Sequence, residues 1–356
     1  MRAIRLRTEY LNNPIGIDIT KPRFYWNCEG GKKQTAYEII AVCNGKEIFH
    51  TGKVVSDAMT HIPYTGEPLQ SRDMVTWKVR LWDEKDQLGE WNSATFEMGL
   101  LEEGDWLAKW ISGDYKPKKK ERYPVDCFKK EFQTKKEIKK ARLYASARGL
   151  YDVCINGSRL TDFILAPGMT DYRKRIQYQI YDVTELLDTE NKIEITVGNG
   201  WYKGILGFYC MPNQYGTQVG TFAELHVEYE DGSKDVIATD ETWSVKTGEI
   251  RYSEIYMGET IDTDAPEITE GNVVVKEFDK AVLTAQENEP VRITEKIAGK
   301  ELIVTPKGER LVDFGQIITG VVELHVKGEK GQKIVIRHAE VLDKDGNFYP
   351  ETLRQA

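Results

Sequence analysis

The sequence has little that would build a metal centre or a disulfide framework. Its five cysteines are odd in number and no Cys-x-x-Cys pair occurs, so disulfide pairing and a zinc site are both disfavoured. No Gly-x-Ser-x-Gly or His-Glu-x-x-His pattern occurs either, which excludes the usual serine-hydrolase and zinc-protease motifs. Free thiols are typical of a reducing compartment, and we therefore expect a cytoplasmic protein.

Long hydrophobic runs and an excess of positive charge are also missing. No segment approaches the ~20 apolar residues that a membrane-spanning helix needs, and the N-terminal MRAIRLRTEYLNN contains no apolar signal-peptide core. The net charge is −8, from 49 Lys and Arg against 57 Asp and Glu, which disfavours the basic face that nucleic-acid binding needs. We therefore expect no nucleic-acid partner and no membrane partner.

Strand patterns dominate what is present. In TWKVRLWD the apolar residues Trp77, Val79 and Leu81 recur at every second position, which predicts a strand with one buried face. Asn-Gly pairs at 44–45 and 156–157 are typical of tight hairpin turns. Short strands at regular spacing with turns between them indicate β-sandwich domains.

The chain is too long for one ordinary domain. Two changes in the sequence divide the chain into domains. A mixed, charged and turn-rich segment lies near residue 103, and a new Val- and Ile-rich pattern begins near residue 286. We predict an all-β protein with three sandwich-type domains in series, over residues 1–103, 104–285 and 286–356. The third pattern stops without a capping segment, and we expect this domain to be incomplete.

One glycine-rich stretch, VGNGWYKGILGF at 197–208, follows an apolar strand pattern. A dinucleotide fingerprint would need these glycines to open a helix within a βαβ unit. Aromatic residues and further glycines follow instead, so a nucleotide site is disfavoured. Two alternatives stay open from the residues alone: a tight β-corner, or a loop whose aromatic rings and amides contact a sugar.

Four segments taken together resemble the bacterial α-L-rhamnosidases. They are the stretch 155–187, the glycine-rich stretch 197–208, GETID at 258–262, and LVDFGQIITG with its continuation at 311–354. The resemblance implies an immunoglobulin- or fibronectin-III-like first domain and a galactose-binding-like jelly roll as the second. It also implies that residues from 286 onward begin a concanavalin-like sandwich.

The resemblance further implies a glycoside hydrolase that hydrolyses terminal α-L-rhamnosides with inversion. In that family the catalytic carboxylates lie in an (α/α)6 barrel that follows these β-domains, and the barrel's Asp-, Arg- and Trp-rich motif does not occur in this sequence. We therefore assign no catalytic residue and expect the chain alone to be inactive. Its expected role is accessory: to bind rhamnose-containing glycans, or to act as a scaffold for the missing catalytic barrel.

Some jelly-roll modules in the family resemble lectins that bind L-rhamnose together with a calcium ion. Calcium takes six to eight oxygen ligands, and we name Asp162 as the candidate ligand. The candidate carbohydrate-binding residues are Trp201 and Tyr215 as ring platforms, with Asn199 and Asn213 as amide partners. Two alternatives remain: a stand-alone rhamnose-binding lectin, and a purely structural interaction module.

Overall fold

The computed structural model describes residues 1–117, 122–160, 163–207, 211–265, 268–277, 280–329 and 331–353. Strands make up most of its regular structure, which confirms the predicted all-β class. Helix in the described residues is limited to α1 (Gly200–Lys203) and the 3-10 turns η1 (Glu103–Asp105), η2 (Thr184–Leu186), η3 (Lys280–Val282) and η4 (Pro350–Leu353). No helix in these ranges is long and apolar enough to cross a membrane. The chain forms two compact units, residues 1–291 and 292–356.

The first unit begins with two antiparallel sheets around one core. One sheet has the order β1-β2-β6 and the other β4-β3-β7-β8, with β5 paired to β3. Their strands are β1 (Arg2–Thr8), β2 (Arg23–Glu29), β3 (Ala36–Cys43), β4 (Lys46–His50), β5 (Val54–Val55), β6 (Ile62–Pro63), β7 (Met74–Trp82) and β8 (Asn92–Glu97). The core contains Trp77, Val79 and Leu81, all fully buried, as the alternation in β7 predicts.

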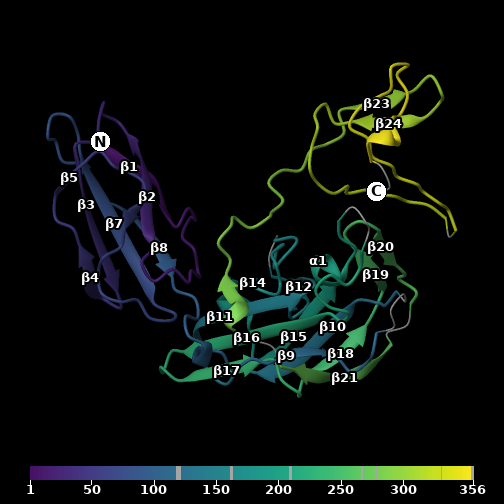
Figure 1. Ribbon diagram of the computed structural model, residues 1–356, viewed down its shortest axis with the longest axis horizontal. Coiled ribbons are helices and arrows are strands. Elements are labelled where there is room, and N and C mark those ends of the chain that lie inside the picture. The colour runs from purple at the N-terminus through teal and green to yellow at the C-terminus, as the bar shows by residue number, and fades with distance from the viewer. Residues whose placement is uncertain are drawn as a thin grey trace. The chain divides into compact units, whose positions relative to one another are not determined.

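The remainder of the first unit is a larger β-structure (Figure 1). Its strands follow the order β13-β12-β15-β10-β18-β21-β9-β16-β11-β14-β22, with β17 on β16 and a separate hairpin β19-β20. Their bounds are β9 (Trp110–Gly113), β10 (Asp126–Gln133), β11 (Ile138–Arg148), β12 (Leu150–Ile155), β13 (Ser158–Arg159), β14 (Ile176–Asp182), β15 (Glu190–Gly198), β16 (Gly220–Tyr229), β17 (Lys234–Ala238), β18 (Ser244–Thr247), β19 (Ile250–Glu254), β20 (Gly258–Ile261), β21 (Ile268–Lys276) and β22 (Leu283–Ala285).

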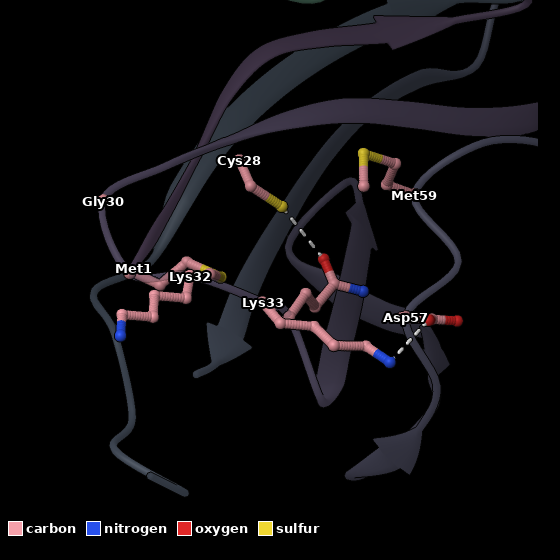
Figure 2. A pocket seen from close by; sticks show the side chains of 9 residues that line it. Met1, Cys28, Gly30, Lys32, Lys33, Asp57 and Met59 are labelled. Atoms are coloured by element: carbon pink, nitrogen blue, oxygen red, sulfur yellow. Dashed lines mark hydrogen bonds and ion pairs between the residues drawn. The ribbon is translucent and has the colours of Figure 1, made fainter. Parts of the chain in front are cut away.

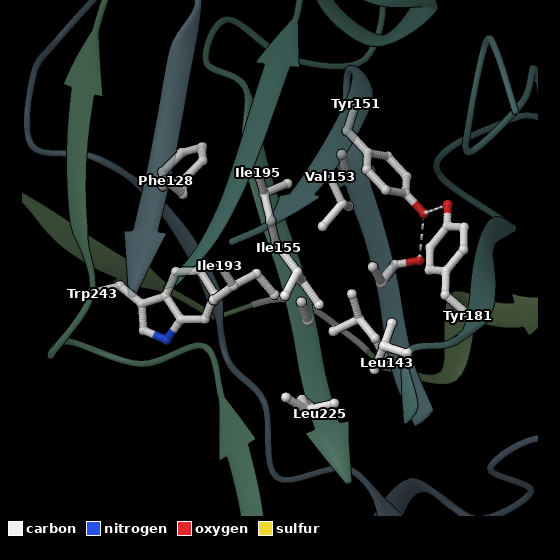
Figure 3. Packing of buried hydrophobic residues seen from close by; sticks show 14 of the residues in the cluster. Phe128, Leu143, Tyr151, Val153, Ile155, Tyr181, Ile193, Ile195, Leu225 and Trp243 are labelled. Atoms are coloured by element: carbon white, nitrogen blue, oxygen red, sulfur yellow. Dashed lines mark hydrogen bonds between the residues drawn. The ribbon is translucent and has the colours of Figure 1, made fainter. Parts of the chain in front are cut away.

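This larger structure has its own hydrophobic core (Figure 3). Side chains of β12 and β15 pack with those of β11 and β16, among them Ile155, Ile195, Leu143 and Leu225. Burying such aliphatic side chains contributes about 1.5–3 kcal/mol each. The alternation in β15 therefore decides which of its faces packs inward.

Both predicted Asn-Gly turns are present. Asn44 and Gly45 join β3 to β4 with φ of 50° and 78°, and Asn156 and Gly157 join β12 to β13 with φ of 51° and 78°. Left-handed backbone at both central positions is what a two-residue hairpin needs, and Asn-Gly supplies it at low cost.

The two parts of the first unit are joined by partly buried polar contacts. Tyr178 on β14 donates its hydroxyl hydrogen to Asp18 Oδ1 at 2.6 Å, and the same phenol oxygen accepts from the backbone N–H of Leu100. Asp18 Oδ2 also accepts from the N–H of Ala285 at 2.6 Å. The N-terminal sheets are therefore tied to β14 and β22 of the larger sheet.

The second unit has few buried side chains. Its sheet in the described residues is the hairpin of β23 (Glu301–Val304) and β24 (Arg310–Asp313). Val321 is 83% exposed and Ile317 is 73% exposed, and the Val- and Ile-rich stretch 317–329 forms no strand. A strand pattern becomes a strand only when partner strands satisfy its backbone, and here those partners are missing among the described residues.

Candidate functional site: the loop around α1

The glycine-rich stretch forms a sharp turn on the sheet. β15 ends at Gly198, and α1 follows after Asn199. Gly200 has φ of +53°, and a Cβ there would lie 2.6 Å from the backbone nitrogen of Leu150 at the start of β12. A side chain at position 200 would therefore be strained twice, by the left-handed backbone and by the contact. The four-residue α1 does not match the longer helix of a dinucleotide fingerprint.

A second segment lies against α1 and completes the loop. The N–H of Asn213 donates to the carbonyl of Lys203 at 2.9 Å, and the N–H of Tyr215 donates to the carbonyl of Tyr202 at 3.2 Å. We call residues 199–204 and 211–216 together the α1 loop. All four predicted carbohydrate-binding residues, Asn199, Trp201, Asn213 and Tyr215, belong to it.

The two predicted ring platforms, Tyr215 and Trp201, differ in how many neighbouring side chains already contact their rings. Tyr215 packs against Tyr172 with ring centroids 5.1 Å apart, and the Arg173 guanidinium lies 5.4 Å from its centroid. Trp201 is half-buried against the apolar cluster beneath it, but its indole stacks on no aromatic ring in the described part of the chain. Trp201 is therefore the more available platform. Sequence reasoning missed Tyr172 and Arg173, although both lie in the family-like stretch 155–187.

The two predicted amide side chains are half-buried and have unused hydrogen-bonding capacity. Within the described ranges, neither the Asn199 nor the Asn213 side chain forms a hydrogen bond. Each amide offers two N–H donors and one carbonyl acceptor. This combination suits alternating donors and acceptors such as sugar hydroxyl groups.

Glu254 at the end of β19 braces the loop from below. Its carboxylate accepts from the backbone N–H of Ile205 at 2.7 Å and from those of Tyr256 and Met257 at 2.8 Å each. The residue is only 5% exposed, so its carboxylate positions backbone and does not face a ligand. Nothing in its sequence surroundings marks the contact with Ile205, because Ile205 lies in the loop after α1, far from Glu254 in the chain.

A buried polar group lies beside α1. The hydroxyl of Tyr115 donates to Asp126 Oδ2 at 2.9 Å. Burial raises the pKa of Asp126 to about 6, and burial also lowers the pKa of Lys203. Asp126 is 2% exposed, so this carboxyl group is a structural element of the fold and not a ligand contact.

The predicted calcium ligand, Asp162, lies outside the described residues. Among the residues that are described, no group of three or more His, Cys, Asp or Glu side chains could hold a metal ion. Calcium binding therefore stays a prediction.

A hollow of about 320 Å³ lies near the N-terminus, away from the α1 loop in sequence (Figure 2). Most of its polar side chains are already engaged: Cys28 Sγ donates to Gln34 Oε1 at 3.3 Å, and Lys33 pairs with Asp57 at 3.2 Å. Lys33 and Asp57 have 65% of each side chain exposed. The hollow has no group of free polar side chains directed into it, so we assign it no site.

Comparison with known families accounts for most of the chain. Residues 3–102 match the "Rha78A-like, N-terminal immunoglobulin domain". Residues 136–295 match the "Alpha-L-rhamnosidase N-terminal domain", and residues 303–356 match the "Bacterial alpha-L-rhamnosidase concanavalin-like domain". The three matches follow one another in the order that the sequence resemblance implies.

Individual relatives agree with these matches. An α-L-rhamnosidase of Formosa agariphila is 34% identical over 98% of this chain and 41% of its own length. The native α-L-rhamnosidase of Aspergillus terreus superposes with a TM-score of 0.91 at 33% identity, over 100% of this chain and 43% of that one. An Alteromonas α-L-rhamnosidase is 29% identical, with 97% of this chain and 40% of its own length covered. The chain therefore spans about two fifths of the length of these curated relatives. It belongs to the α-L-rhamnosidase family and corresponds to the N-terminal β-domains of its members.

Proposed function

We propose that this chain is the accessory, non-catalytic region of an enzyme that hydrolyses terminal α-L-rhamnosides. The observation that carries the proposal is the ordered match of three rhamnosidase β-domains along one chain. We keep the boundaries 1–103, 104–285 and 286–356 as the proposed domain limits. Helix among the described residues is limited to α1 and short 3-10 turns, which supports placing the catalytic (α/α)6 barrel outside them. We expect the chain by itself not to turn over a rhamnoside.

We further propose that the α1 loop binds L-rhamnose as part of a glycan. In this proposal the indole of Trp201 stacks on the C–H face of the sugar, while the amides of Asn199 and Asn213 hold its hydroxyl groups. Tyr215 completes the site, its ring held in place by Tyr172 and Arg173. Support comes from the half-buried rings and the unused amides, because sugar sites combine an aromatic platform with a few polar groups.

Isothermal titration calorimetry of the purified chain with L-rhamnose tests this proposal. We expect saturable heat from the parent chain. Trp201→Ala should lower the affinity for L-rhamnose at least about tenfold, a loss of about 1.4 kcal/mol in binding free energy. Trp91→Ala is the matched control, because Trp91 is a half-buried tryptophan of the N-terminal domain, against which Lys78 and Arg80 lie. Equal heats for both variants would reject the α1 loop as the binding site.

The same titration separates the alternatives. Binding by the isolated chain without any barrel would favour a lectin-like role, and no heat at millimolar sugar would leave the β-domains as scaffold. Repeating the titration with calcium and then with excess chelator tests the predicted role of Asp162: heat that chelator abolishes supports it, and unchanged heat rejects it.

The cytoplasmic location also stays part of the proposal. Cys28, Cys43, Cys127 and Cys154 are free thiols in the structure, which is compatible with a reducing compartment. Fractionation of the native host, followed by detection of the chain with an antibody, would test it.

A further inference from the structure

We propose that the N-terminal immunoglobulin-like domain carries a second carbohydrate platform, centred on Tyr10, that takes a pyranose unit. The ring of Tyr10 lies on the outer face of the β1-β2-β6 sheet, and the residue is 48% exposed. This site lies outside the α1 loop, so the inference goes beyond the proposed function.

Tyr10 lies in an unfavourable backbone conformation. Thr8 and Leu11 exchange two backbone hydrogen bonds, of 3.0 and 2.9 Å, so Glu9 and Tyr10 are the two central residues of a hairpin turn. Their φ values are 49° and 71°. Both positions of such a turn favour Asn or Gly, and a tyrosine there is disfavoured by its Cβ. The turn itself therefore does not explain why this position carries a bulky aromatic residue.

Several contacts hold the turn in this conformation. The Glu9 carboxylate accepts from the backbone N–H of Arg23 at 2.6 Å and from its guanidinium Nε and Nη2 at 3.0 and 2.5 Å. Glu9 is 5% exposed. The turn is therefore rigid before any ligand arrives, and preorganisation of this kind lowers the entropic cost of binding.

Among the described residues, Tyr10 has three neighbours on its ring and is still 48% exposed. In β2, Phe24 and Trp26 point into the core, so Arg23 and Tyr25 point to the outer face. Tyr10 contacts both: its centroid lies 4.8 Å from that of Tyr25 and 5.3 Å from the Arg23 guanidinium carbon. The His61 ring lies edge-on to the Tyr10 ring, with centroids 6.1 Å apart. The residue nevertheless stays 48% exposed, so part of Tyr10 remains open to a ligand.

The polar groups around the ring favour a sugar over an apolar partner. Glu9 pairs with Arg23 beside the ring, and the exposed Arg7 guanidinium donates to the backbone carbonyl of Tyr10 at 3.3 Å. At the rim, Tyr10 Oη lies 3.1 Å from Nε2 of the exposed His61, which also has a positive φ, of 58°. The exposed amide of Asn12 follows two residues along the chain. One flat ring with hydroxyl, imidazole and amide groups beside it matches a single pyranose, whereas a stable protein interface needs a much larger surface.

Saturation-transfer NMR on the full chain tests this inference. The chain also carries Trp201→Ala, so that the α1 loop does not contribute, and the probes are methyl α-L-rhamnopyranoside and methyl β-D-galactopyranoside. We expect transfer to the C–H protons of at least one probe, with affinity lowered about tenfold or more by Tyr10→Gly. Glycine accepts the left-handed backbone, so this variant keeps the turn and folds. Tyr256→Ala, which removes a tyrosine that is 52% exposed in the turn after β19, is the control and should keep the signal.

Three results would overturn the inference. The first is no saturation transfer to either sugar, and the second is a signal that Tyr10→Gly leaves unchanged. The third is a Tyr10→Gly variant that keeps its sugar binding but loses self-association in sedimentation velocity. The last result would identify the patch as a protein contact. Failure at Tyr10 leaves the titration with Trp201→Ala unaffected, so the two proposals fail independently.

Discussion

The Arg142 guanidinium on β11 donates to both carboxylate oxygens of Glu97 on β8, through Nη2 to Oε1 at 2.6 Å and through Nε to Oε2 at 3.1 Å. Both residues are less than 10% exposed. The pair joins the last strand of the N-terminal sheets to the larger sheet, so the two parts of the first unit are coupled by a buried ion pair.

Removing one partner of this pair should be costly. Glu97→Ala leaves the Arg142 charge buried with Asp182 as its remaining carboxylate partner, and losses of about 3–5 kcal/mol are typical when one member of a buried pair is removed. Urea denaturation measures the change in the free energy of unfolding. Glu29→Ala is the control, because Arg2 and Glu29 are paired at the surface, where a pair contributes about 1 kcal/mol or less. A similar small loss in both variants would show that the buried pair does not couple the two parts.

The stability of the first unit should fall as the pH rises through the titration of Asp126. Its pKa is raised from 3.8 to about 6 because burial disfavours the charged form. The favourable contribution of the neutral form is complete below pH 3.8 and is lost as pH rises through about 6. Asp126→Asn removes this loss, so the variant should gain stability relative to the parent at pH 7.5, by up to about 3 kcal/mol, and gain nothing near pH 4.

Urea denaturation at the two pH values measures this difference. Asp231→Asn is the control of opposite sign, since Lys136 lowers the pKa of Asp231 and its contribution is present at neutral pH and lost in acid. A gain for Asp126→Asn that does not change with pH would contradict the prediction.

Alanine substitutions at two glycines of the glycine-rich stretch should differ in how much stability they cost. Gly200→Ala places a Cβ 2.6 Å from the Leu150 nitrogen in addition to the left-handed backbone, whereas Gly207→Ala places one at φ of +71° with no atom within 4 Å. The left-handed backbone alone costs about 1–2 kcal/mol, so Gly207→Ala should lose about that much and Gly200→Ala clearly more. Thermal unfolding followed by circular dichroism measures both, and equal losses would mean that α1 moves away from β12 without cost.

The exposed apolar residues of the second unit should promote self-association. Ile317→Lys combined with Val321→Lys should lower the association measured by sedimentation velocity, because contiguous exposed apolar side chains favour contact with another surface. Val55→Lys is the control: Val55 is 84% exposed in β5, and isolated exposed apolar residues are ordinary. Association that persists in the double variant would reject the prediction and weaken the structural-module alternative.

Much of the fold was predictable because its signals are local. Alternation in TWKVRLWD placed Trp77 in the core, and Asn156-Gly157 marked a hairpin, since each depends only on neighbouring residues. Local signals do not decide the structure of 317–329, a Val- and Ile-rich stretch that forms no strand, because whether a β-pattern pairs depends on strands elsewhere.

The candidate sites divide in the same way. The sequence by itself determined that Asn199 and Trp201 share one glycine-rich loop and that the chain resembles the rhamnosidases. Only the tertiary structure decided that segment 211–216 lies against α1 and that Glu254 braces this loop. It alone also showed that Tyr10 lies over Arg23 and Tyr25. Such contacts join separate turns and strands of the chain. They follow from strand order and packing, which no short stretch of sequence specifies.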